Sequence, residues 1–207
     1  MDSKAHWNAI YEKHEPSEVS WYQAEAHLSF SLIRDVAPSL DSAVLDVGGG
    51  ASTLVDALLD AGYRDVTVLD VAEAALTAAR SRLGDRSANV QWRVADVLAA
   101  PFDPQTIDVW HDRAVFHFLT GLDERRRYVE QVRRAVRRGG HVLVATFAED
   151  GPTRCSGLRV MRYDAEELHG EFGDDFRLVR SVREEHHTPW GAEQAFTYCL
   201  CRIERIE

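Results

Sequence analysis

Apolar and polar positions in the middle of this chain alternate between two periods. Residues 42–47 form a short, mostly apolar run, and residues 51–61 then place leucine and valine at helical spacing until Gly62. A short apolar run is typical of a strand buried on both faces, and a glycine directly after a periodic stretch is typical of a helix C-terminus. The pattern therefore predicts a strand followed by a helix.

The same alternation continues downstream. Further strands are predicted at residues 66–69, 89–94, 107–111 and 141–147. Helices are predicted at residues 72–83 and 123–138, with a shorter helix between the strands at 89–94 and 107–111. Strands that alternate with helices indicate βαβ units, in which parallel strands are connected by helices that cover both faces of the sheet.

The pattern changes after residue 170. Two strand-like stretches, 176–184 and 194–202, are separated by a segment that contains Pro189 and Gly191, which favours a hairpin at one edge of the sheet. The predicted fold class is therefore α/β, with a doubly wound, mostly parallel seven-stranded sheet, helices on both faces and a C-terminal antiparallel hairpin.

Residues 1–40 precede the first predicted core strand. Residues 1–24 are rich in aromatic side chains, and residues 28–36 show the apolar spacing of a helix that packs on the sheet. We expect residues 1–24 to form a lead-in or lid over a cofactor or substrate, and residues 25–207 to form one domain. The alternative is that the aromatic side chains only hold the lead-in against the core.

Composition narrows the possible partners. The chain has 207 residues, a formal net charge of -10 and three cysteines. An acidic chain lacks the excess of Lys and Arg that drives binding to a phosphate backbone, so we expect no nucleic-acid partner. An odd number of cysteines favours a reducing compartment, and no apolar run is long enough to span a membrane, so we expect a cytoplasmic protein. His186 and His187 lack partners at metal-ligand spacing, so no metal site is predicted.

The segment after the first predicted strand carries the clearest chemical signal. Three glycines, Gly48, Gly49 and Gly50, follow Asp46 and lead into a predicted helix. Glycines allow backbone N–H groups to approach a ligand closely, and the helix directs its positive N-terminal end toward that ligand. Thr53 replaces the third glycine of the dinucleotide fingerprint, which disfavours a pyrophosphate. The Asp46 carboxylate instead favours a cationic or amine-bearing ligand.

The order of these features resembles the class I, seven-strand S-adenosylmethionine (SAM)-dependent methyltransferases over residues 25–205. The shared features are a glycine loop after the first strand, acidic residues that end the second and third strands, a polar residue after the fourth, a Gly-Gly pair before the fifth, and a closing hairpin. In this chain Arg137 and Arg138 precede Gly139 and Gly140, where many family members have a proline.

The resemblance implies that the cofactor is S-adenosyl-L-methionine, which becomes S-adenosyl-L-homocysteine (SAH). The residues it implies around the methionine part of SAM are Asp46, Gly48, Gly49 and Gly50. Apart from the resemblance, Asp112 in the polar cluster after the fourth strand is a candidate contact for the ammonium group, and Trp21, with Trp7 and Tyr11, is a candidate cation–π contact to the sulfonium.

The resemblance assigns the nucleoside part of SAM to the ends of the second and third strands. It implies that Asp70 binds the two ribose hydroxyls, that Asp96 accepts from the adenine amino group, and that Val71 and the Val97 backbone lie against the ring.

A polar cluster after the fourth strand supplies candidate catalytic groups. His111 or His117 is a candidate base, and Arg113 a candidate site for an anionic acceptor. Alternatively, Asp112 and Arg113 form a structural ion pair and the histidines only pack. After the fifth strand, Arg154 is a candidate anion clamp and Cys155 a soft contact to the acceptor, or this segment is a solvated loop whose cysteine packs inward.

The expected function is methyl transfer from SAM to a small-molecule acceptor. The motifs typical of DNA amino-methylating enzymes and of cytosine methyltransferases are absent from the sequence. The first alternative is a protein methyltransferase that acts on a lysine or an N-terminal amine, and the second is a non-catalytic SAM-fold binding protein. The sequence leaves open the acceptor, the accepting atom, the use of a base and the oligomeric state.

Overall fold

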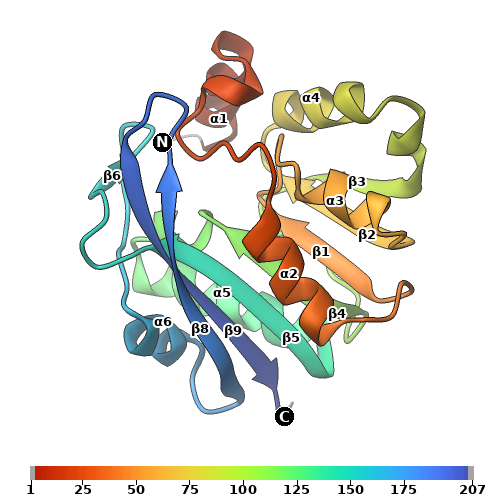
Figure 1. The fold of residues 1–207 in the computed structure, drawn as a ribbon. Helices are drawn as coiled ribbons and strands as arrows, with labels where there is room; N and C mark the ends of the chain where they lie inside the picture. Colours follow the sequence, from red (N-terminus) through yellow and green to blue (C-terminus); the bar gives the residue numbers. More distant parts are fainter. Residues whose placement is uncertain (1–2, 205–207) are drawn as a thin grey trace.

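The computed structural model describes residues 3–204, and its core is a seven-stranded sheet in the order β3-β2-β1-β4-β5-β9-β8 (Figure 1). The strands are β1 (Ala43–Val47), β2 (Asp65–Asp70), β3 (Val90–Val94), β4 (Ile107–Arg113), β5 (Val136–Phe147), β8 (Phe176–His187) and β9 (Glu193–Ile203). β1 to β5 pair in parallel, whereas β9 is antiparallel to both β5 and β8. The predicted fold class, including the closing hairpin, is confirmed.

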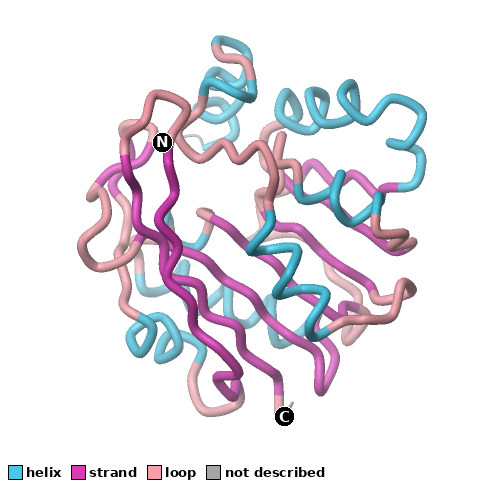
Figure 2. Tube along the Cα trace, viewed as in Figure 1, coloured by secondary structure: helices cyan, strands magenta, loops and turns pink. Residues whose placement is uncertain are grey.

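Helices cover both faces of this sheet (Figures 1 and 2). Side chains of α2 (His27–Val36), α3 (Leu54–Asp60) and α4 (Glu73–Leu83) share one buried apolar cluster with the sheet. Those of α5 (Leu122–Ala135) and α6 (Ala165–Phe172) share a second cluster with the opposite face. The remaining helix, α1 (Ser3–Lys13), lies beside α4, where the Ala74 N–H donates to the Asn8 side chain at 3.1 Å.

Short elements complete the chain. They are 3-10 helices at Pro16–Glu18, Gly84–Asn89 and Phe116–Phe118, and a small hairpin formed by β6 (Arg154–Cys155) and β7 (Leu158–Arg159). Among residues 3–204, no helix is both long enough and apolar enough to cross a membrane.

The alternation of side chains along β4 determines which residues meet. Val109 belongs to the apolar cluster on the α2 side of the sheet, and Trp110 belongs to the cluster on the α5 side. Because successive side chains in a strand point to opposite faces, His111 returns to the α2 side and Asp112 to the α5 side. Their hydrogen bonds agree with this, since His111 contacts Ser29 in α2 and Asp112 contacts Tyr128 in α5.

Two helix predictions are wrong, because one predicted helix is absent and another ends earlier than predicted. Between β3 and β4, residues 95–106 form turns and no helix, and the turn at Asp96 to Ala100 stops before Pro101. A proline lacks the N–H that would continue a helix and disfavours helical geometry in the residue before it. The helix predicted to end at residue 138 ends at Ala135, because the buried Val136 already pairs with Ile107 and begins β5.

Candidate active site

A cavity lies where the carboxyl ends of β1, β2 and β4 meet the N-terminal helix. We call it the main cavity. Its walls come from the loop after β1, the end of β2, the turn after β3, the end of β4, α1 and Cys155. In an open parallel sheet, ligands bind outside the carboxyl ends of the strands, which is where this cavity is found.

The glycine loop leaves no room for side chains. A Cβ on Gly48 would overlap the side chain of Val115, and one on Gly49 would lie 2.5 Å from the Asp46 carboxylate. Gly48 and Gly50 have φ angles of 64° and 47°, in the left-handed region that favours glycine. Gly48 lines the main cavity, and Gly49 lines a smaller neighbouring one, which we call the second cavity. The three glycines therefore pack so closely that a Cβ on any of them would crowd a neighbouring side chain, and we call them the glycine cradle.

Asp70 ends β2 at the wall of the main cavity. One carboxylate oxygen accepts from the Ala72 N–H at 2.7 Å, and the other lies next to Gly50, where an added Cβ would be 3.0 Å away. Burial raises the pKa of Asp70 to about 7, although the N–H groups of Ala72, Val71 and Gly50 oppose this shift and the nearby Asp46 adds to it. The site thus holds an acceptor group that two vicinal hydroxyls can pair with.

The turn after β3 brings a second carboxylate to the same cavity. Asp96 lines the main cavity together with Val71 and Val97, and its side chain accepts from the Leu98 N–H at 2.9 Å. Val97 is buried, whereas Asp96 is exposed. This combination of an apolar wall and one acceptor suits a flat heterocycle that carries an amino group.

Aromatic side chains from the N-terminal region line the same cavity. Trp7 in α1 makes edge-to-face contacts with Trp21, at 5.7 Å between ring centroids, and with Phe118, at 5.0 Å. The Trp21 indole N–H donates to the Tyr11 hydroxyl at 3.3 Å, and burial raises the pKa of Tyr11. All four side chains line the main cavity, so α1 and the residues after it form an aromatic wall.

His111 is held on both sides. One ring nitrogen is 2.7 Å from a carboxylate oxygen of Asp46 on the neighbouring strand, and the other is 2.9 Å from the Ser29 hydroxyl. The ring is 3% exposed and lines the second cavity rather than the main one. Both ring nitrogens are therefore engaged, and His111 helps to fix the position of Asp46; its role as a base stays a prediction.

Asp46 keeps one oxygen without a partner. Its second carboxylate oxygen is buried and makes no hydrogen bond to any of residues 3–204. That oxygen lies beside Gly49, and Asp46 lines the second cavity with it. A buried carboxylate oxygen without a partner is costly, and an ammonium group that donates to it would remove the cost.

His117 does not line the main cavity. It is fully buried, and its ring packs at 4.8 Å from Phe147 and 4.4 Å from Phe118 between centroids. Neither ring nitrogen has a hydrogen-bond partner within the described part of the chain, and burial lowers the pKa to about 3. The 3-10 helix at Phe116–Phe118 turns this side chain toward Phe147 in β5 and away from the main cavity, and its role as a base stays a prediction.

Asp112 organises the turn after β4 and does not reach the main cavity. It accepts from the Tyr128 hydroxyl at 2.6 Å and from the Val115 and Phe116 N–H groups at 2.8 and 3.1 Å. Burial raises the pKa of Asp112 to about 6. Because Asp112 points to the α5 side and Arg113 to the other, the two do not form the ion pair of the alternative interpretation. The contact of Asp112 with the cofactor ammonium stays a prediction.

Arg113 lines the main cavity and joins three distant segments. Its guanidinium donates to the Tyr198 hydroxyl at 2.8 Å, to the Trp21 carbonyl at 3.1 Å and to the Glu184 carboxylate at 3.3 Å. It also stacks over Phe196, 4.2 Å from the ring centroid. Sequence reasoning missed Glu184 and Tyr198, because only the pairing of β8 with β9 and of β9 with β5 brings them to Arg113.

The small hairpin separates two residues that are adjacent in the sequence. Cys155 is buried and lines the main cavity, and burial raises the pKa of its thiol to about 11. Arg154 points outward and donates to the Gly157 carbonyl at 2.8 Å across the turn. Cys155 therefore faces the main cavity and Arg154 does not, and their roles toward an acceptor stay predictions.

Comparisons with a family model and with curated proteins show similarity to methyltransferases. The family model described as a methyltransferase domain matches residues 44–140. The mouse eEF1A lysine and N-terminal methyltransferase is 26% identical over 141 residues, which cover 68% of this chain and 20% of that protein. The Roseobacter denitrificans ubiquinone/menaquinone biosynthesis C-methyltransferase UbiE is 28% identical over 55% of this chain and 46% of its own length. The chain spans about a fifth of the first of these relatives.

A solved structure has the same fold. The Burkholderia thailandensis 1,6-didemethyltoxoflavin-N1-methyltransferase, solved with 1,6-didemethyltoxoflavin and SAH, superposes with a TM-score of 0.68 at 18% identity and covers 98% of this chain and 84% of its own. The strand order, the glycine cradle, the carboxylates at successive strand ends and these similarities agree with one another. Residues 44–140 therefore match a methyltransferase domain, and the chain has the fold of the class I, SAM-dependent methyltransferases.

Proposed function

We propose that this protein transfers a methyl group from SAM to a small-molecule acceptor that enters the main cavity beneath α1. The observation that carries the proposal is the aromatic wall. Trp7, Trp21 and Phe118 line the cavity together with Cys155, so the space beside the cofactor residues is bounded by apolar side chains. An apolar compartment of this kind suits a small organic acceptor.

The residues around the two cavities suit SAM. Asp70 would pair with the ribose hydroxyls, and Asp96 with Val71 and Val97 would hold the adenine. The glycine cradle and the unpartnered oxygen of Asp46 would hold the methionine part, with the ammonium as donor. Trp21 would face the sulfonium. When bound, SAM supplies a methyl group that its sulfonium activates for transfer.

The chain's own residues contribute alignment and exclusion of water. His111 is engaged by Asp46 and Ser29, and His117 lies outside the main cavity, so neither supplies a base there. Burial raises the pKa values of Tyr11 and Cys155, so both groups are protonated near neutral pH. The acceptor therefore presents its own lone pair, as an amine, a carboxylate or a thiolate does, and the protein positions it.

Residues 1–24 would act as the lid of this compartment. Three of the four aromatic side chains in the wall belong to this segment, and Arg113 holds its Trp21 carbonyl. Arg113 would also place a positive charge at the acceptor, and Cys155 would provide an apolar contact.

The test is transfer of a radiolabelled methyl group from SAM into a fractionated cell extract. We expect label in the small-molecule fraction with the parent protein and none with the Asp70→Ala variant, which serves as the matched control. Label in protein alone would establish instead the kind of activity named for the eEF1A relatives. Tight SAH binding without transfer to either fraction would establish a non-catalytic binding protein.

A further inference from the structure

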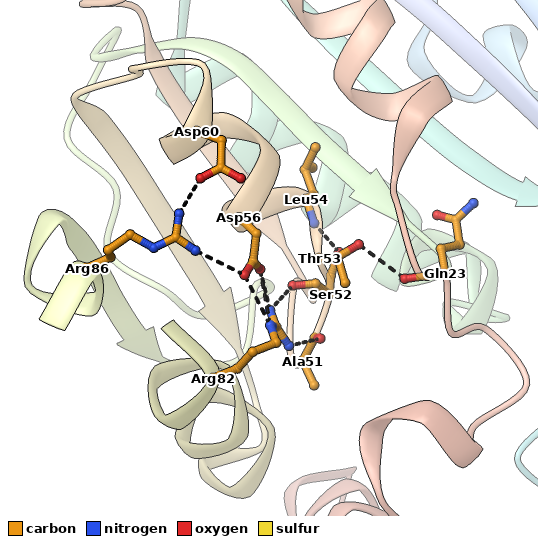
Figure 3. Close-up of polar contacts among 9 residues, drawn as sticks. All are labelled: Gln23, Ala51, Ser52, Thr53, Leu54, Asp56, Asp60, Arg82 and Arg86. Atoms are coloured by element: carbon orange, nitrogen blue, oxygen red, sulfur yellow. Dashed lines mark hydrogen bonds and ion pairs between the residues drawn. The ribbon is translucent and has the colours of Figure 1, made fainter. Parts of the chain in front are cut away.

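Arg82 reaches from the last turn of α4 to the end of the glycine loop (Figure 3). One terminal nitrogen donates to the Ala51 carbonyl and the other to the Ser52 carbonyl, each at 2.7 Å. The same guanidinium pairs with Asp56 in α3, at 2.7 Å through a terminal nitrogen and 3.2 Å through Nε. One planar side chain thus binds two successive loop carbonyls and the helix that follows them.

The two carbonyls belong to a tight turn. The Ser52 N–H donates to the Gly49 carbonyl at 2.7 Å, and the Ser52 hydroxyl accepts from the Leu54 N–H at 3.1 Å. Gly50 lies inside this turn, where its Cα faces Asp70 and the Tyr11 hydroxyl. The outer side of the turn is therefore bound to Arg82, and the inner side faces the residues that would hold SAM.

The turn is also bound from the N-terminal side. The Thr53 hydroxyl donates to the Gln23 carbonyl at 3.1 Å, near the end of the segment proposed as the lid. Figure 3 shows Arg82 and Gln23 approaching residues 51–53 from opposite sides. Arg82 supplies the stronger hold, since it is charged and makes several hydrogen bonds in a fixed plane.

We propose that Arg82 is a positioning residue for the cofactor, because it fixes the glycine cradle from outside without lining either cavity. The proposal rests on the proposed function, since the ligand of the cradle is taken to be SAM. A loosened turn would move Gly49 and Gly50 away from Asp46 and Asp70, and SAM binding would weaken. The chemistry of transfer would be unaffected once SAM is bound.

Arg86 provides a matched control. It follows α4 by one turn, pairs with Asp60 and lies 3.6 Å from the same Asp56 carboxylate. No contact between Arg86 and a loop carbonyl is found among the described residues (Figure 3). Replacing Arg86 removes one positive charge and its contacts with α3, as replacing Arg82 removes one positive charge and its contact with Asp56, but leaves the turn bound.

The experiment measures SAH affinity by calorimetry and thermal unfolding of the whole chain, for the parent and for Arg82→Gln, Arg82→Lys and Arg86→Gln. Hydrogen bonds from a charged group to two carbonyls support an expected loss of about tenfold in SAH affinity for Arg82→Gln. We expect a matching rise in KM for SAM with kcat unchanged. Arg82→Lys should fall between, because an ammonium cannot bind both carbonyls and Asp56 in one plane.

Arg86→Gln should leave the SAH affinity unchanged. Equal affinity in Arg82→Gln and the parent would overturn the inference, and so would an equal loss in Arg86→Gln, which would point to the helix pairing alone. If Arg82→Gln does not fold, Arg82→Lys decides by the same criterion. A parent protein that binds no SAH would overturn the proposed function itself, which separates the two failures.

Discussion

Two walls of the main cavity differ in where along the chain their residues come from. The strand-end wall, which contains Gly48, Asp70 and Asp96, comes from the ends of three strands that lie side by side, β1, β2 and β3. The Arg113 wall, which contains Arg113, Trp21 and Cys155, depends on contacts between the N-terminal region and the β8–β9 hairpin. Parallel pairing alone builds the first wall, whereas the second requires the assembled tertiary structure.

The largest expected effect is the loss of cofactor affinity when one carboxylate of the strand-end wall is removed. In Asp70→Ala, SAM loses the acceptor for both ribose hydroxyls, and we expect SAH affinity to fall by at least about 100-fold, from the usual strength of hydrogen bonds to a charged group. Calorimetry measures this loss. The folded state should persist, because the variant removes a buried carboxylate; affinity within a few-fold of the parent would contradict the assignment.

A substitution in the Arg113 wall should lower the rate of methyl transfer and leave the affinity for the cofactor unchanged. In Arg113→Lys, the ammonium cannot reach Tyr198, Glu184 and the Trp21 carbonyl together, and we expect the rate of methyl transfer into the extract to fall about tenfold. SAH affinity should stay unchanged, since SAH carries no sulfonium charge for Trp21 to face. An equal fall in SAH affinity would show that the two walls are not separable.

The pH dependence of stability should distinguish Asp70 from its neutral replacement. Because the pKa of Asp70 is raised to about 7, the folded protein keeps the proton that the unfolded chain releases near pH 4. Its contribution to stability is therefore present below pH 4 and is lost as the pH rises toward 7. We expect Asp70→Asn to gain Tm relative to the parent over that interval, and a constant difference between pH 4 and 7 would contradict this.

The affinity for the cofactor should also depend on the ionisation of Asp70, but it should increase as the pH rises. The ionised carboxylate is the better acceptor for two hydroxyls, so SAH affinity of the parent should rise as the pH increases through about 7. Asp70→Asn should lack this rise, which calorimetry at several pH values measures.

The smallest effect is expected on the α5 side of β4. The Tyr128 hydroxyl accepts from the Trp110 indole at 2.8 Å and donates to Asp112 at 2.6 Å, away from both walls. Tyr128→Phe should lower the free energy of unfolding by about 1–2 kcal/mol, the usual cost of leaving buried partners unpaired. SAH affinity should not change. Chemical denaturation measures the stability, and a lost affinity would place the Asp112 turn within the cofactor site.

The strand-end wall was predictable because its signal is local. Asp46, Asp70 and Asp96 each come at or just after the end of an apolar run, and the carboxyl ends of parallel strands meet at one edge. The mostly parallel sheet and the closing hairpin followed from the same alternation of periods. The roles of individual side chains at these positions stay predictions.

The directions of the side chains in the cluster at the end of β4 could not be predicted from local sequence patterns in the same way. His111, Asp112 and Arg113 are consecutive, and a strand sends alternate side chains to opposite faces, so Asp112 points away from His111 and Arg113. His117 lies in a 3-10 helix whose orientation no local pattern shows. Glu184, Tyr198 and Arg82 became visible only through long-range contacts, because nothing in their neighbouring residues marks them.

The bonds of Arg113 have a kinetic consequence. One guanidinium, 9% exposed at its side chain, binds the Trp21 carbonyl of the N-terminal segment and both strands of the hairpin. If residues 1–24 act as the lid that we propose, their withdrawal leaves a nearly buried cation without one of its partners, and that raises the barrier to opening. We expect product exchange to be slower than the chemical step, so that the first turnover appears as a burst followed by a slower steady state.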